Sequence, residues 1–267
     1  MSIDVSLAAW SISFAYAHAL NSQPPDIWWL LLPLSVWIIY TFDHLMDSRK
    51  LPLSAAPERY LIHKQYFRFL FAIISIVAAS ILMLSFIYFP LKFITQAIAL
   101  GMCVVGYFAY SILNHKYIIP REIIVVIVFT LGVCFGPIYY SPNEVNYILV
   151  VSIFITCMAN LCLFSKFEKL NHEILSKTNM FSSLTLKQAD IICYTICTFG
   201  ILLNIILLFY FGFSPLIFSL LIIDAIYLCL IYFQERMKIH YLYRIKGDGV
   251  LILPGIFTLC FQCLSNF

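Results

Sequence analysis

The sequence predicts an all-α, polytopic membrane protein, and two observations support this fold class. Of the 267 residues, 63% are hydrophobic and only 11% are charged, whereas soluble domains carry about a quarter charged residues. The apolar residues also form runs of about 20, the length of a membrane-spanning helix, without the alternation of a transmembrane barrel. No water-soluble interior of this size encloses so much apolar surface, so the excess should face lipid.

Nine apolar segments account for the expected helices. We place them at about residues 5–21, 27–46, 67–89, 93–113, 122–140, 146–165, 190–211, 214–233 and 249–265. The breaks between them fall at Pro, Gly or clusters of charge, which interrupt regular structure. The first segment lacks the basic region and cleavage site of a signal peptide, so we expect it to remain as a span. The segments together predict one transmembrane helical domain over residues 1–267.

Charge alternates between the loops, which supports nine spans and orients them. All but one of the 16 Lys and Arg residues follow spans two, four, six and eight, and Lys92 is the exception. Loops rich in Lys and Arg stay in the cytoplasm, so we expect a cytoplasmic N-terminus and a C-terminus on the far side.

The nine cysteines lie within spans, where we interpret them as small packing residues. We expect membrane lipids, and no nucleic acid, as partners.

An acidic pair lies at the cytoplasmic end of the second span. Asp43 and Asp47 are four residues apart, which places both side chains on one helix face. Carboxylates at membrane depth are costly and are functional candidates by default. A hard divalent cation between them would relieve their repulsion. The alternative is that both acids only solvate a helix end beside Arg49 and Lys50.

A second polar stripe lies at the end of the sixth span. Ser165, Glu168 and His172 follow the spacing i, i+3 and i+7, which is one face of a helix. Both stripes end at the cytoplasmic side, so they could line one cavity; the alternative is a solvated start of a loop. Cations on the same side could hold a substrate that carries phosphates, or could only set topology and meet anionic lipid. The candidates are Lys116, Arg121, Lys166 and Lys169, with Arg236, Lys238, Arg244 and Lys246 in the last cytoplasmic loop.

Other polar residues lie inside the spans. Asp224 is near the middle of the eighth span and must face the interior of the bundle. His18 and Asn204 are weaker candidates of the same kind. Asp248 opens the ninth span and could cap its N-terminus.

With these stripes the sequence resembles the UbiA superfamily of intramembrane prenyltransferases. That family has nine transmembrane helices and two acidic motifs, N-x-x-x-D-x-x-x-D and D-x-x-D-x-x-x-D, at the cytoplasmic ends of helices two and six. Asp43 and Asp47 match both acids of the first motif, and Ile39 replaces its Asn. In the second motif, Ser165, Glu168 and His172 take the three acidic positions. Some divergent members of the family have aromatic-x-x-Asp-x-x-x-Asp and Phe-Ser-x-x-Glu motifs. This chain resembles those members more than it resembles the quinone-biosynthesis enzymes of the family.

The resemblance implies nine helices around a central cavity that opens to the cytoplasm. It implies a Mg²⁺-dependent prenyltransferase, a transferase of alkyl groups other than methyl, acting on an isoprenyl diphosphate and an aromatic or other lipid-soluble acceptor. Asp43, Asp47 and Glu168 would be the catalytic metal ligands. Lys116, Arg121, Lys166 and Lys169 would bind the diphosphate. The resemblance also favours a bacterial inner membrane.

Two other functions remain open at this stage. A terpene cyclase of the same superfamily would use the same site, with the acceptor inside the isoprenyl chain. A non-catalytic transporter or lipid-binding protein with the same fold would use Asp224 and His18 as its functional polar groups. A CDP-alcohol phosphotransferase is disfavoured because the sequence contains no D-x-x-D-G-x-x-A-R motif.

Overall fold

The computed structural model describes residues 3–50, 58–113, 120–142, 146–171, 179–237 and 242–265, and its regular structure in these ranges is entirely helical. The helices are α1 (Ile3–Ala19), α2 (Trp28–Lys50), α3 (Glu58–Gln65), α4 (Phe67–Tyr88), α5 (Leu91–Leu113), α6 (Arg121–Tyr139), α7 (Tyr147–Leu170), α8 (Leu186–Phe211), α9 (Pro215–Tyr232), α10 (Gln234–Met237), α11 (Leu242–Val250) and α12 (Leu253–Ser265). The expected all-α membrane fold is therefore confirmed.

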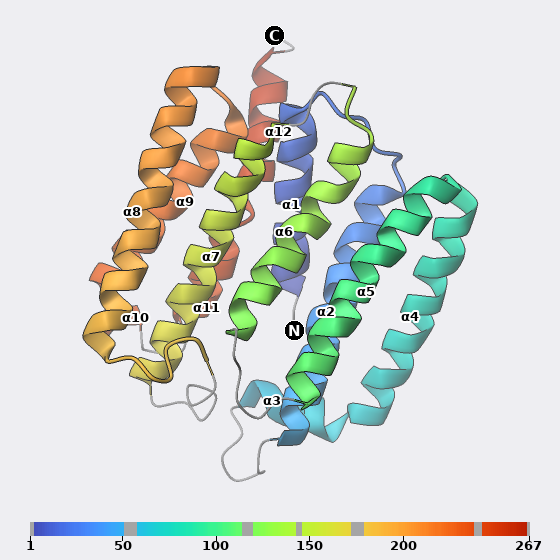
Figure 1. Cartoon of the computed structure of the whole chain (residues 1–267), viewed down its shortest axis with the longest axis horizontal. Helices are drawn as coiled ribbons and strands as arrows, with labels where there is room; N and C mark the ends of the chain where they lie inside the picture. The colour runs from blue at the N-terminus through green and yellow to red at the C-terminus, as the bar shows by residue number, and fades with distance from the viewer. Residues whose placement is uncertain are drawn as a thin grey trace.

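Each of the nine expected segments is helical. Eight stretches of the described residues are long and apolar enough to cross a membrane: α2, α4, α5, α6, α7, α8, α9 and the stretch of α11 and α12. The remaining segment is α1, which has 17 residues and begins near the middle height of the bundle (Figure 1). The last segment differs from its expected bounds of 249–265, because helix begins earlier, at Leu242, and a turn at Leu251 and Ile252 separates α11 from α12. Arg244 and Lys246, expected in the preceding loop, therefore lie on α11.

Helix α1 lies inside the bundle and contacts α2, α6, α9, α11 and α12. Its Ser11 hydroxyl donates to the carbonyl of Ile252 at 2.7 Å and accepts from the backbone N–H of Gly255 at 2.6 Å. A Cβ atom on Gly255 would lie 2.8 Å from the Ser11 oxygen, so this approach requires glycine. These contacts hold α12 against α1 where the last segment turns, and polar bonds between close helices stabilise membrane bundles.

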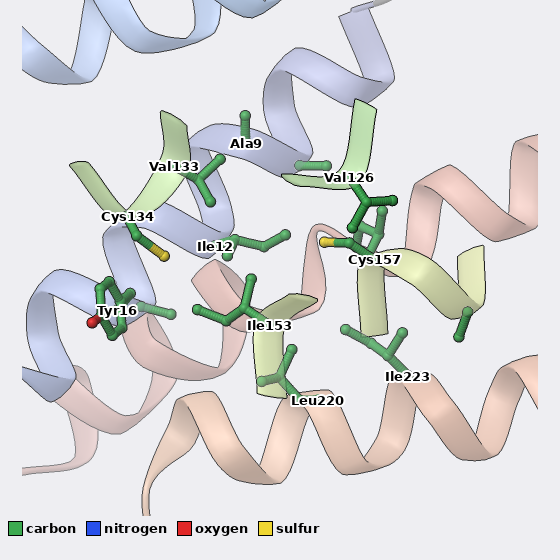
Figure 2. Packing of buried hydrophobic residues seen from close by; sticks show 14 of the residues in the cluster. Ala9, Ile12, Tyr16, Val126, Val133, Cys134, Ile153, Cys157, Leu220 and Ile223 are labelled. Atoms are coloured by element: carbon green, nitrogen blue, oxygen red, sulfur yellow. The ribbon is translucent and has the colours of Figure 1, made fainter. Parts of the chain in front are cut away.

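The apolar core joins helices that are distant in the sequence. Ile12 of α1, Val133 of α6, Ile153 of α7 and Leu220 of α9 point toward one another in the interior (Figure 2). Helix α7 is the most enclosed of the long helices, with 67% of its apolar stretch buried, whereas α4 has only 11%. The core therefore surrounds α7, and α4 presents its apolar side chains to the membrane.

A buried hydrogen-bonded network ties α7, α8 and α9 together. The Ser152 hydroxyl donates to Asn204 Oδ1 at 2.6 Å, and Asn204 Nδ2 donates to Asp224 Oδ2 at 3.2 Å. Thr156 Oγ1 donates to the same Asp224 oxygen at 3.2 Å. A Cβ atom on Gly200 would lie 2.3 Å from that oxygen, so glycine makes the network possible. Asp224 thus fulfils the expectation that it faces the interior. Its Oδ2 is bonded within the network, and its Oδ1 has no hydrogen-bond partner among the described residues.

Candidate functional site

A cavity of about 310 Å³ opens among α1, α2, α3, α6, α7 and α11. Its polar wall includes Asp43, Arg121, Glu122, Glu168 and Arg244. These residues come from the end of the bundle where α2 and α7 finish and α6 begins (Figure 1). Two stripes that are far apart in the sequence, around Asp43 and Glu168, therefore line one cavity.

The acidic pair of α2 is bridged by one arginine of α6. Arg121 donates from Nη1 to Asp47 Oδ2 at 3.0 Å and from Nη2 to Asp43 Oδ2 at 3.4 Å. The Tyr107 hydroxyl of α5 donates to Asp43 Oδ1 at 2.8 Å. The Asp47 side chain is 3% exposed and that of Asp43 is 16% exposed. The four-residue spacing thus places both carboxylates on one face, and a guanidinium lies where their repulsion requires positive charge.

The second stripe carries its own arginine. Glu168 of α7 forms an ion pair with Arg244 of α11 through Oε1, and its Oε2 accepts from Asn179 Nδ2 at 3.4 Å. The guanidinium of Arg244 also lies 5.3 Å from the centre of the Phe164 ring. Glu168 therefore lines the cavity, as its position on the stripe predicts. Its partner Arg244 was expected in a loop, as one of many candidate cations, but lies on α11.

Sequence reasoning missed Glu122, one of the buried acids of the cavity. Its Oε1 accepts from the backbone N–H of Met180 at 3.1 Å and lies 3.5 Å from the Ser165 hydroxyl. Its Oε2 has no hydrogen-bond partner among the described residues, although the side chain is only 9% exposed. The one signal in the sequence was an acid beside Arg121 in the first turn of a span.

The predicted diphosphate-binding cations do not all reach the cavity. Arg121 lines it. Lys166 is buried against α8, where its ammonium group pairs with Asp190 at 2.5 Å. Lys169 donates to the carbonyls of Phe181, Ser182 and Leu184 and so holds the turn before α8. Lys116 and His172 lie outside the described residues.

The residues present could hold one magnesium ion through Asp43 and Asp47, but the structure does not bring three carboxylates together in the described ranges. Asp43 and Asp47 offer carboxylate oxygens, the ligands that Mg²⁺ prefers, and both already face one cationic group. In the described ranges, no three His, Cys, Asp or Glu side chains lie close enough together to hold a metal ion. Glu168 is in the same cavity but pairs with Arg244. The three-carboxylate ligand set therefore stays a prediction.

Asp248 does not cap the last helix, contrary to the expectation from its position. It lies within α11, and its carboxylate accepts from Asn160 Nδ2 at 3.1 Å on the wall of the cavity. The apolar part of that wall includes Val126, Phe129 and Leu161. The cavity thus combines a charged end with an apolar side, an arrangement typical of sites for amphipathic ligands.

Comparison with known proteins establishes the fold. No family model matches the chain, and no curated protein matches its sequence. Among solved structures, the apo structure of a UbiA homolog from Aeropyrum pernix K1 matches 98% of this chain and 99% of its own, with a TM-score of 0.71 and 12% sequence identity. At this identity the likeness concerns the fold. The chain therefore has a UbiA-type membrane fold, as the two acidic stripes predicted.

Proposed function

We propose that this UbiA-fold membrane protein is a Mg²⁺-dependent prenyltransferase that moves an isoprenyl group from its diphosphate to an aromatic or other lipid-soluble acceptor and releases diphosphate. One observation carries the proposal. One cavity is lined by two carboxylate–arginine pairs, Asp43 with Arg121 and Glu168 with Arg244, beside an apolar wall. Asp47 also bonds Arg121 but is not among the residues that line the cavity. An isoprenyl diphosphate is the kind of molecule that needs both surfaces.

The charged end would bind the diphosphate. A guanidinium offers paired N–H donors that match phosphate oxygens, and Arg121 and Arg244 both line the cavity. Asp43 and Asp47 would hold Mg²⁺, which supplies Lewis-acid stabilisation of the leaving diphosphate when bound. The arginines add fixed positive charge where negative charge develops as the bond to the isoprenyl carbon breaks.

The apolar wall would hold the isoprenyl chain and protect the allylic cation. Phe129 and Phe164 line the cavity, and the Phe164 ring already packs near a guanidinium. An aromatic face stabilises a neighbouring cation by roughly 0.5–2 kcal/mol. Exclusion of water by this wall would suppress hydrolysis in favour of attack by the acceptor.

The orientation in the membrane follows from charge and is part of the proposal. All Lys and Arg residues except Lys92 follow the expected spans two, four, six and eight, and Asp43 and Glu168 lie at the ends of two of these spans. By the positive-inside rule these ends face the cytoplasm, with the N-terminus on the same side of the membrane. We propose the bacterial inner membrane as the location.

The non-catalytic alternative is less well supported, because its polar groups lie elsewhere. Asp224 is bonded within the α7–α9 network, and His18 packs against Phe261 with 6.3 Å between ring centres. Neither residue lines the cavity.

Release of diphosphate tests the proposal. The purified protein in lipid nanodiscs is incubated with prenyl diphosphates of several lengths, with and without Mg²⁺ and candidate acceptors. We expect Mg²⁺-dependent release that falls at least tenfold in Asp43→Asn and Glu168→Gln. Asp26→Asn, an exposed acid between α1 and α2, is the control. Release that is equal in all variants, or unaffected by chelation, would contradict the proposal; release without an acceptor and with a cyclic product would indicate a cyclase.

A further inference from the structure

The cavity contains a second polar group, formed by Asn160 and Asp248, apart from the acids Asp43 and Glu168 that pair with arginines. Asn160 precedes Glu168 by eight residues on α7, so it lies roughly 12 Å further along the helix at 1.5 Å per residue. Asp248 follows Arg244 by four residues on α11. Both side chains line the cavity, although Asn160 is only 5% exposed and Asp248 only 9%. We call this pair the inner polar group.

The inner polar group has an unused hydrogen-bond acceptor. Asn160 Nδ2 donates to Asp248 Oδ1 at 3.1 Å, and this bond fixes the amide because a carboxylate oxygen needs a donor. The amide oxygen, Asn160 Oδ1, has no partner among the described residues. A buried acceptor without a donor is costly and requires an explanation. A ligand that brings a hydroxyl or N–H group into the cavity would supply the missing donor.

The backbone holds this group in place. A Cβ atom on Gly247 would lie 2.6 Å from Phe164 Cε1 and 3.2 Å from Asn160 Oδ1. Tyr227 donates to the carbonyl of Gly247 at 3.1 Å, from α9. The glycine therefore allows α11 to approach α7, and the unused oxygen lies on rigid, packed helices rather than on a loop.

The charges nearby select the ligand further. Asp4, in the first turn of α1, lines the cavity together with Asp248. The facing cation on α11 is Arg244, and Glu168 already pairs with it. A ligand carboxylate would be repelled by the two acids Asp4 and Asp248, whereas a neutral hydroxyl could donate a hydrogen bond to the acceptors there. The adjoining Leu161 and Leu251 are apolar, which suits the carbon skeleton of a lipid-soluble molecule.

We infer that the inner polar group binds the prenyl acceptor, and that this acceptor is a neutral hydroxyl compound, such as a phenol or an alcohol, rather than a carboxylate. The role of acceptor rests on the proposed function, whereas the ligand class rests on Asn160, Asp248 and the neighbouring residues of the cavity wall. Asn160 Oδ1 accepts the hydroxyl proton in a hydrogen bond, and Asp248 holds the amide and repels anions. A site built around a hydrogen bond discriminates strongly against an analogue that lacks the donor.

Binding of three small probes to the full chain in nanodiscs tests the inference without prenyl transfer. Naphthol carries the hydroxyl, naphthalene lacks it, and naphthoate replaces it with a carboxylate. We expect naphthol to bind the wild type more tightly than either analogue. Asn160→Leu should weaken naphthol roughly three- to tenfold, the effect of one hydrogen bond, and should leave naphthalene unchanged. Ser152→Ala, a buried polar residue of α7 outside the cavity, is the matched control and should retain the preference.

A second variant is expected to gain affinity for naphthoate, which a misfolded protein would not do. Asp248→Asn removes the repelling charge and should tighten binding of naphthoate relative to wild type. If Asn160→Leu keeps the full preference for naphthol, or if Asp248→Asn gains no affinity for naphthoate, the inference is overturned. Diphosphate release from the same preparations separates the two proposals. If no diphosphate is released but the preference for naphthol depends on Asn160, only the prenyltransferase proposal is refuted. If diphosphate is released normally but that preference is missing, only the role of the inner polar group as acceptor site is refuted.

Discussion

Replacement of Arg121 by glutamine tests whether the acidic pair depends on one guanidinium. The variant leaves Asp43 and Asp47 facing each other without the cation that now lies 3.4 and 3.0 Å from them. Loss of one partner of a buried ion pair costs about 3–5 kcal/mol. Arg121 is 22% exposed and Asp43 borders the cavity, so water relieves part of this cost. We therefore expect the lower end, about 3 kcal/mol.

Thermal unfolding in nanodiscs measures this effect. At roughly 2–4 °C per kcal/mol for a chain of this size, the melting temperature should fall by roughly 6–12 °C. Arg236→Gln, a change at an exposed arginine, should stay within about 0.5 kcal/mol of wild type. Mg²⁺ should stabilise Arg121→Gln more than wild type, by up to about 2.7 kcal/mol at a hundredfold excess over its Kd, because it would replace the positive charge that Asp43 and Asp47 lose with Arg121.

A double-mutant cycle decides whether the contact itself is responsible. Arg121→Gln and Asp47→Asn should couple by at least about 1 kcal/mol, since they remove two ends of one interaction. Strict additivity of the two changes would refute the reasoning. So would a melting temperature of Arg121→Gln equal to that of the Arg236→Gln control.

Three further predictions concern other contacts. Arg244→Gln should weaken binding of inorganic diphosphate in the presence of Mg²⁺ roughly tenfold by calorimetry, the cost of one charged hydrogen bond; an unchanged Kd would remove Arg244 from the site. Lys166→Met should lower the melting temperature, because the buried ammonium group of Lys166 pairs with Asp190, yet it should leave that Kd unchanged. A lost affinity would restore Lys166 as a diphosphate ligand. Gly200→Ala should cost about 1–3 kcal/mol of stability, because its Cβ overlaps the Asp224 carboxylate, whereas Gly101→Ala, with open space, should not; equal melting temperatures would contradict the packing.

Most of the fold was accessible from hydropathy and charge. Apolar length places the helices, and the α4 segment, expected at 67–89, is Phe67–Tyr88. The turn at Leu251 and Ile252 was missed, although Pro254 follows it in the sequence and has no N–H to continue a helix from Val250. The bonds of Ser11 with Ile252 and Gly255 hold the chain at this turn, and sequence alone does not reveal those contacts.

The candidate site was accessible only in part. Spacing within one helix predicts that Asp43 and Asp47 share a face, and it places Glu168 on the stripe that lines the cavity. Neighbouring residues on a helix point about 100° apart, which explains why Lys166 turns toward α8 while Ser165 lines the cavity. Spacing within one helix does not reveal which residues of other helices contact it. The roles of Arg244 and Glu122 therefore became clear only from the tertiary structure.

The balance of charge in the cavity gives a physical reason for a metal ion that spacing alone does not give. Among the described residues, the cavity wall contains the acids Asp4, Asp43, Glu122, Glu168 and Asp248 but only two arginines, Arg121 and Arg244. A diphosphate adds further negative charge, and in a site partly shielded from water this repulsion is weakly screened. Both arginines are already paired with carboxylates, so turning them toward a diphosphate would cost those acids their ion pairs with the arginines. A divalent cation that entered with the diphosphate would restore positive charge beside these acids and would add charge to hold the phosphates. The pairing of acids with arginines is therefore compatible with metal dependence, and it predicts that diphosphate without a divalent cation should bind poorly.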